Sequence, residues 1–180
     1  MTAAADRVPV NRAPVLTLWA AVVAERLGFD PDEARTLGRA LAGMNAQTKG
    51  QRLGIRAPRE PGKPARRKRE PAGRTLVELM GRGIPAVRTG AGLRALDSGG
   101  GPADPQAVER YLERRFGAAL PETRRTLKAL AASFDPDTLA RHAFGLYETF
   151  RPAIPTGKAG WGAKGVLDLA RVRALAQESG

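Results

Sequence analysis

The most concentrated group of chemically active side chains in this 180-residue sequence is the run KPARRKR, which contains Lys63, Arg66, Arg67, Lys68 and Arg69. Consecutive cations neutralise phosphates and release counterions, so they give binding that depends on salt and little on base sequence. The same chemistry suits an acidic protein or a lipid headgroup, and the run could also be a solvated linker or, in a eukaryote, a nuclear-import signal. We favour contact with nucleic acid.

The positive charge of the chain gathers around this run. The sequence has 30 Lys and Arg against 18 Asp and Glu, a formal net charge of +12, and its isoelectric point is near 11.2. Residues 49–74 contain ten of the basic and two of the acidic side chains, so this stretch alone supplies +8. It also contains four prolines and four glycines, and it buries too little apolar surface to offset its ordering entropy. We therefore expect a flexible, disordered basic linker over 49–74.

A second candidate site lies in the glycine-rich stretch 156–165, where Trp161 stands between Lys158 and Lys164. A tryptophan on such a backbone can stack on a base while the flanking ammonium groups hold phosphates. The same tryptophan can instead dock the loop on the helices as a plug, and this second interpretation is the more economical one. The stretch is not a P-loop, because Ala163 occupies the position where that motif requires lysine.

The composition excludes several other kinds of site. The chain has no cysteine and one histidine, so a disulfide scaffold, a thiolate nucleophile and a multi-histidine metal site are impossible within it. No catalytic motif surrounds His142, the sole imidazole. Carboxylate pairs such as Asp30 with Asp32 are explained more simply as helix starts. We expect no metal ion, no cofactor and no enzymatic activity; an enzyme with an unfamiliar site around 156–165 and His142 is the least favoured alternative.

Helix-starting signals divide the rest of the chain. Asp-Pro pairs at 30–31, 104–105 and 135–136 place a side-chain acceptor at the N-cap and proline at the first helical position, and Glu33 completes a capping box. Together with the apolar spacing they predict helices at about 13–27, 31–46, 105–116, 121–132 and 136–150, and a last helix capped by Asp168. Between them, the sequence predicts a hairpin over 75–89 with a turn at 81–83 and Pro85 on an edge strand, then a short helical turn at 91–96.

The apolar stretch 13–24 has the dimensions of a signal peptide. Its large apolar residues recur at helical spacing, however, and Glu25 and Arg26 continue the pattern, so we interpret it as an amphipathic helix of the fold. No apolar run reaches the roughly 18–20 residues that a membrane span needs. The sequence therefore predicts a cytoplasmic protein without membrane contact.

Two further basic features have a functional and a structural interpretation. The first two helices have the proportions of a helix-turn-helix, with Arg35 and Arg39 on the second, but residues 1–48 are electrically neutral and we do not favour groove reading. Arginines and glutamates alternate between residues 109 and 125, which is typical of a mixed, solvated helix face.

These observations predict a mainly α fold with an N-terminal helical pair (1–48), a flexible basic linker (49–74), and then a short β-hairpin followed by a helical bundle (75–180). The leading hypothesis is a small basic protein that binds the phosphate backbone of DNA or RNA non-specifically through its disordered arm, with helices that position the arm or form a homodimer. The alternative is a helical protein–protein interaction module or adaptor with no nucleic-acid role. Arginine outnumbers lysine 24 to 6, which is typical of GC-rich bacterial coding, so we expect a bacterial protein, nucleoid-associated if its ligand is DNA.

Overall fold

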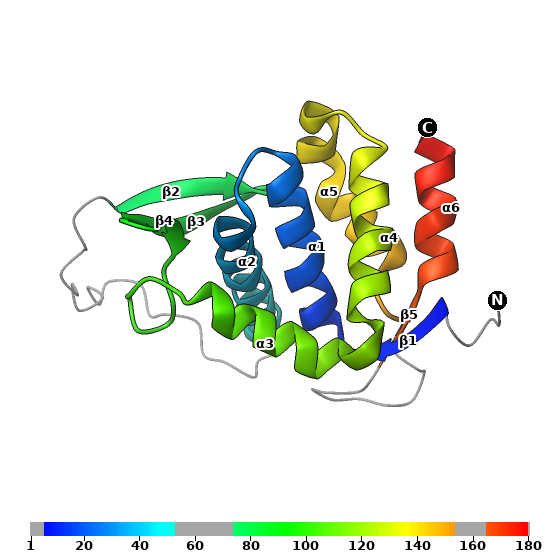
Figure 1. Cartoon of the computed structure of the whole chain (residues 1–180), viewed down its shortest axis with the longest axis horizontal. Helices are drawn as coiled ribbons and strands as arrows, with labels where there is room; N and C mark the ends of the chain where they lie inside the picture. The colour runs from blue at the N-terminus through cyan, green and yellow to red at the C-terminus, as the bar shows by residue number, and fades with distance from the viewer. Residues whose placement is uncertain (1–5, 53–73, 154–164, 180) are drawn as a thin grey trace.

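The structure, a computed structural model, describes residues 6–52, 74–153 and 165–179, and all of their side chains except those of 46–52. It is mainly helical, and the predicted order of a helical pair, a β-hairpin and further helices is confirmed (Figure 1). The elements are β1 (Arg7–Val10), α1 (Arg12–Arg26), α2 (Pro31–Arg52), β2 (Arg74–Leu79), β3 (Arg82–Thr89), β4 (Gly92–Ala95), α3 (Pro105–Phe116), the 3₁₀ turn η2 (Gly117–Ala119), α4 (Leu120–Ala132), α5 (Pro136–Phe150), β5 (Gly165–Asp168) and α6 (Leu169–Ser179).

Helix α1 forms the centre of the molecule. Every residue from Pro14 to Ala24 is buried, because α2, α3, α4 and α5 all pack against this helix (Figure 1). The Trp19 indole donates a 2.9 Å hydrogen bond to the Ala143 carbonyl of α5 and meets the Phe150 ring edge to face. The predicted helix is confirmed, but its amphipathic character was wrong: a helix that is apolar on all sides is buried on all sides.

Helices α1 and α2 pack unusually closely. Gly28, in the left-handed region at φ +113°, ends α1 and lets the chain reverse. A Cβ atom on Gly38 would lie 2.5 Å from the Thr17 carbonyl oxygen and 2.8 Å from the Ala21 nitrogen, so only glycine fits at this crossing. Helix α2 continues to Arg52, past its predicted end near residue 46.

The helix starts follow the predicted capping chemistry. Asp30 and Glu33 exchange hydrogen bonds as a capping box, at 2.8 Å and 3.1 Å. The other predicted caps also accept from backbone N–H groups at the starts of α3, α5 and α6: Asp104 from Gln106, Asp135 from Thr138, and Asp168 from Ala170. One hydrophobic core contains residues from all of the described helices, so the segments on either side of residues 53–73 pack together.

The predicted hairpin is confirmed, and it extends into a three-stranded antiparallel sheet in the order β2-β3-β4. Its turn is Met80-Gly81, with φ values of +51° and +80°, one residue before the predicted turn. The helical turn predicted at 91–96 was wrong, because this segment forms β4 against β3.

Pro85 lies in the central strand β3, so its predicted edge position was also wrong. The Pro85 carbonyl accepts a 2.9 Å hydrogen bond from the Leu96 nitrogen, which means that this residue faces the β4 side. Proline has no backbone N–H to donate. Because β4 ends at Ala95, an N–H at position 85 would point beyond the end of that strand, so the proline is tolerated there.

A second, two-stranded ladder was not predicted. Strand β1 pairs antiparallel with β5, and it alternates exposed Arg7 and Pro9 with buried Val8 and Val10. The pairing fastens the start of the described chain beside α6. No helix among the described residues has both the length and the apolar character to cross a bilayer.

Candidate nucleic-acid interface

The eight residues predicted to bind nucleic acid lie outside the described residues. Lys63, Arg66, Arg67, Lys68 and Arg69 fall in 53–73, and Lys158, Trp161 and Lys164 fall in 154–164. What the structure gives is the framework to which these two stretches are attached.

The stretch 53–73 connects the end of α2 to the start of β2, and 154–164 connects Ala153 to β5. The two ends of 154–164 are joined, since Ala153 forms a β-bridge with Val166. A Cβ atom on Gly165 would lie 2.7 Å from the Pro152 Cβ, so the close approach of these two backbones requires glycine. Figure 1 shows the β2 sheet and the β1–β5 ladder toward opposite ends of the long axis.

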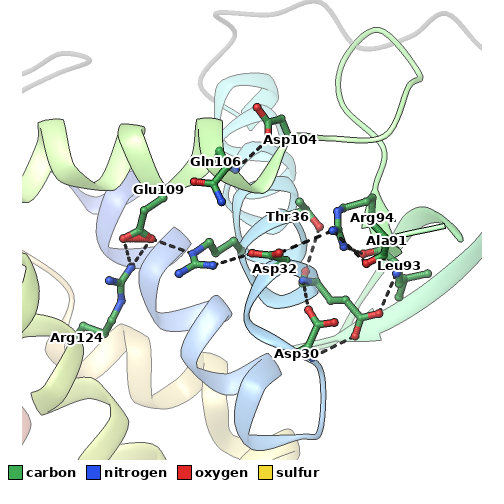
Figure 2. A network of polar contacts seen from close by, with 12 residues as sticks. Asp30, Asp32, Thr36, Ala91, Leu93, Arg94, Asp104, Gln106, Glu109 and Arg124 are labelled. Atoms are coloured by element: carbon green, nitrogen blue, oxygen red, sulfur yellow. Dashed lines mark hydrogen bonds and ion pairs between the residues drawn. The ribbon is translucent and has the colours of Figure 1, made fainter. Parts of the chain in front are cut away.

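The most connected polar group of the described helices is Glu109 on α3. One nitrogen of Arg124 on α4 donates to both carboxylate oxygens at 2.8 Å, and Nε of Arg35 on α2 donates to one of them at 2.9 Å. Figure 2 shows Glu109 facing Arg124 and the contacts continuing toward α2. Glu109 thereby joins three helices, and the expectation that the charges between 109 and 125 form a solvated face was wrong here, since Glu109, Arg35 and Arg124 are half-buried.

The electrostatics of this group follow from its two guanidinium neighbours. Burial alone would raise the pKa of the Glu109 carboxyl, but hydrogen bonds and positive charge from Arg124 and Arg35 outweigh burial, and its pKa lies below the ordinary value. Arg35 also donates to Asp32 at 2.9 Å. The cluster thus pairs two cations with two carboxylates, and its guanidinium groups already have anionic partners.

The same chain of contacts continues into the sheet. The buried Arg94 of β4 donates to the Leu93 carbonyl at 2.9 Å and lies 3.9 Å from the Asp32 carboxylate (Figure 2). Glu33, besides its capping role, accepts a 2.9 Å hydrogen bond from the Leu93 nitrogen. These contacts fix the sheet against the start of α2, so we assign Arg94 a structural role.

Two further arginines are held by an aromatic ring. The guanidinium carbon of Arg39 lies 4.5 Å from the centre of the Tyr111 ring, and that of Arg115 lies 5.6 Å from it. Burial raises the pKa of the Tyr111 phenol, although the two arginines oppose that shift. Since Arg35 and Arg39 both contact α3, the residues that a helix-turn-helix would present to a major groove are engaged within the fold.

The surface beside these helices is hollowed in two places. A hollow of about 580 Å³ lies along α3 and α4, and a smaller one of about 210 Å³ lies between α1, α2 and α4. Arg124 and Lys128 line both. The larger hollow also contains Arg125, Glu109 and Glu113, so its charge is mixed. Lys128 is exposed and forms no ion pair with the described residues, which leaves it the most available cation of this surface.

The described residues offer little for other chemistries. Their large exposed apolar side chains are Leu76 and Val166, so no aromatic ring among them is exposed for base stacking. His142 lies on the exposed face of α5. Within the described ranges, no group of three acidic or histidine side chains is placed to hold a metal ion.

No family model, no curated protein and no solved structure matches this chain. Its class is therefore defined by its own features: a mainly α protein with a largely buried central helix and a small antiparallel sheet, in which more than half of the net positive charge lies outside the described residues.

Proposed function

We propose that this protein binds nucleic acid non-specifically through the phosphate backbone, with Lys63 and Arg66 to Arg69 as the main contacts. Lys158, Trp161 and Lys164 supply a second contact. The helical body, by which we mean residues 6–52, 74–153 and 165–179, holds the two cationic segments on one framework. The main support is the division of charge between the helical body and the rest of the chain.

That division is uneven. The helical body has 21 basic and 16 acidic residues, a net charge of +5, whereas the remaining 38 residues have nine basic and two acidic ones, a net charge of +7. Many arginines of the body are already paired: Arg35 and Arg124 with Glu109, Arg125 with Glu122, and Arg173 with Asp6 and Glu122. A phosphate would have to displace these carboxylates. The run from Arg66 to Arg69 has four cations in succession, so it is the better phosphate ligand.

The assignment of a stacking role to Trp161 follows from the other aromatic side chains. Within the helical body each of them is buried or half-buried, with Trp19 and Tyr147 in the core. Base stacking needs an accessible ring, so Trp161 is the candidate for it. On this proposal the protein acts in the bacterial cytoplasm, on the nucleoid if its ligand is DNA, and a homodimer would double the number of phosphate contacts.

The test is a salt titration of binding to labelled duplex DNA, single-stranded DNA and RNA, followed by fluorescence anisotropy. Five phosphate contacts give a slope of log affinity against log salt of about −4.5 on duplex DNA, or a loss of roughly 500-fold between 50 and 200 mM salt. Replacing Arg66, Arg67, Lys68 and Arg69 by alanine removes about four of these contacts, so the slope is expected to become shallower by about 3.6.

A matched control removes the same charge elsewhere. Arg7, Arg88, Arg141 and Arg171 are exposed, spread over the helical body, and form no ion pair with other described residues. Their fourfold replacement by alanine is expected to change the slope by less than about one. Equal losses in the two variants would mean that only net charge matters, and absence of binding to all three ligands at low salt would refute the proposal in favour of the adaptor alternative.

A further inference from the structure

Two arginines that are far apart in the sequence lie together where α1 begins and α5 ends. Nε of Arg12, the first residue of α1, donates a 2.9 Å hydrogen bond to the carbonyl of Pro152, the residue that follows Arg151. The Arg151 backbone N–H donates to the Tyr147 carbonyl at 2.7 Å and ends α5. These contacts hold the start of α1 against the end of α5, so the two half-buried arginines share one neighbourhood.

The positive charge of Arg12 is poorly placed for a folded protein. Burial lowers the pKa of the Arg12 guanidinium, and the positive charge of Arg151 lowers that pKa further. Arg12 also lies at the positive end of the α1 dipole, in a first turn that contains no acidic residue. All three effects disfavour a cation at this position, and an anion beside the two guanidinium groups would offset them.

The described residues do not supply that anion. Neither Arg12 nor Arg151 forms an ion pair with them. The Tyr147 hydroxyl donates to the Arg12 carbonyl at 3.4 Å, but burial raises the pKa of Tyr147 to about 12, so the phenol is neutral at pH 7. Glu148, the next residue of α5, is exposed and pairs with neither arginine. The stretch 154–164 contains no aspartate or glutamate in its sequence.

The hydrogen-bond donors at this place suit a phosphate group. Arg12 uses Nε for the Pro152 carbonyl, which leaves its two terminal nitrogens without a partner among the described residues. The Arg151 side chain makes no hydrogen bond to any described residue. The planar guanidinium group matches the geometry of phosphate oxygens and binds them in pairs. One phosphate can therefore accept from both arginines and neutralise the charge that they share.

We propose that Arg12 and Arg151 together bind one phosphate group, which on the proposed function belongs to the backbone of the bound nucleic acid. Arg151 comes shortly before the stretch that contains Lys158 and Lys164, so this site extends the second proposed contact onto the helical body. Both arginines are part of the folded body. Phosphate that binds to them therefore stabilises the folded protein.

Thermal unfolding of the full chain in inorganic phosphate tests the site without nucleic acid. The Tm of wild type is expected to rise with phosphate, relative to chloride of the same ionic strength, because this ligand binds the folded state. Arg151→Gln removes one guanidinium group and is expected to weaken phosphate binding at least about tenfold. Because the Arg151 side chain has no hydrogen bond among the described residues, the variant is expected to fold as wild type, which circular dichroism checks.

The matched control is Arg141→Gln. Arg141 is also on α5, is exposed and forms no ion pair with other described residues, so its replacement removes the same charge and is expected to keep the full rise in Tm. Phosphate that binds to the KPARRKR run contributes equally in all of these proteins. Arg151→Lys retains the charge but loses the paired donors, so it is expected to recover only part of the response.

Binding of a labelled oligonucleotide at low salt, followed by fluorescence anisotropy, tests the source of the phosphate. Arg151→Gln is expected to bind roughly tenfold more weakly than wild type, whereas Arg141→Gln is expected to bind as wild type does. Arg151→Lys is expected to lie between them, because it still attracts the backbone as a point charge.

The two measurements separate the possible failures. Equal increases of Tm in wild type and Arg151→Gln, or no increase in wild type, would overturn the phosphate site. A site that responds to inorganic phosphate, while Arg151→Gln leaves oligonucleotide binding unchanged, would show that it takes a free phosphate compound and would overturn its assignment to the nucleic-acid backbone. Failure of wild type to bind any nucleic acid would overturn the proposed function and that assignment, and the thermal unfolding would still decide whether the two arginines bind phosphate.

Discussion

Replacing Glu109 by glutamine is the most direct test of how the helices are held together. Glutamine has nearly the same shape as glutamate, but it has no charge, and one of its two terminal atoms is a donor instead of an acceptor. In the native structure both carboxylate oxygens accept from Arg124, and one also accepts from Arg35. Glu109→Gln therefore loses at least one hydrogen bond outright. The hydrogen bonds that remain are weaker, because their acceptor no longer carries a negative charge.

The size of the effect follows from the partners and their burial. Hydrogen bonds to charged groups contribute about 1.5–3 kcal/mol each, against about 0.5–1.5 kcal/mol for neutral ones. The side chain of Glu109 is 18% exposed and those of both arginines are 26% exposed, so solvent screens part of this interaction. We expect Glu109→Gln to lower the free energy of unfolding by about 2 kcal/mol, which in a protein of this size lowers Tm by roughly 4–8 °C.

The pH dependence gives a second, independent signature. Because its pKa is lowered in the folded state, Glu109 contributes stability that is complete above the ordinary glutamate pKa of about 4.3 and is lost as the pH falls through its lower folded value. Wild type and Glu109→Gln should therefore differ at pH 7 and converge in acid. Urea denaturation followed by tryptophan fluorescence at several pH values measures this difference.

The matched control is Glu113→Gln, one turn further along α3. Glu113 is exposed, lines the same hollow, and forms no ion pair with other described residues, so its replacement should change stability by less than about 0.5 kcal/mol. The role of Glu109 as the link between α2 and α4 would be contradicted if the two replacements had equal effects. It would also be contradicted if the stability difference between wild type and Glu109→Gln did not shrink in acid.

Two further predictions concern the core. Gly38→Ala would force α1 and α2 apart and is expected to lower the free energy of unfolding by about 3 kcal/mol. Gly43→Ala on the same helix, where nothing lies within 4 Å of an added Cβ atom, should be neutral or stabilise by up to about 1 kcal/mol. Urea denaturation measures both variants. Burial raises the pKa of Tyr147 to about 12 and also raises the pKa of Tyr111. A titration of the folded protein, followed by phenolate absorbance, should therefore show little tyrosine ionisation at about pH 10. In the urea-unfolded chain, about half of the tyrosine side chains should be ionised at that pH. The neutral Tyr147 adds stability that is complete below about pH 10 and lost as the pH rises through about 12.

Much of the helical framework could be predicted because its signals are local. Asp104 and Asp135 are followed directly by proline, and the side chain of each caps its helix as the sequence indicates. The hairpin over β2 and β3 was predicted for the same reason, since its two strands are adjacent in the sequence. The helical turn predicted at 91–96 failed because β4 has four residues, and it becomes a strand only through pairing with β3.

The polar cluster could not have been found from sequence patterns. Glu109 meets Arg35, which is 74 residues earlier, and Arg124, which is 15 residues later, so no helical spacing connects the three. The charges alone suggested a solvated surface. The cationic segments are the opposite case: their composition is plain in the sequence, but Lys63 to Arg69 and Lys158 to Lys164 lie outside the described residues, and their role stays a prediction.

The position of α1 has a consequence for biosynthesis. This helix precedes α2 to α6 in the chain, yet the surfaces that cover it belong to helices that are translated later, up to α5 at Pro136–Phe150. While those helices are still being made, a helix with eleven consecutive residues that are buried in the folded protein has nothing to pack against except α2. The nascent chain therefore carries a strongly apolar segment whose later partners are absent until α5 has been translated.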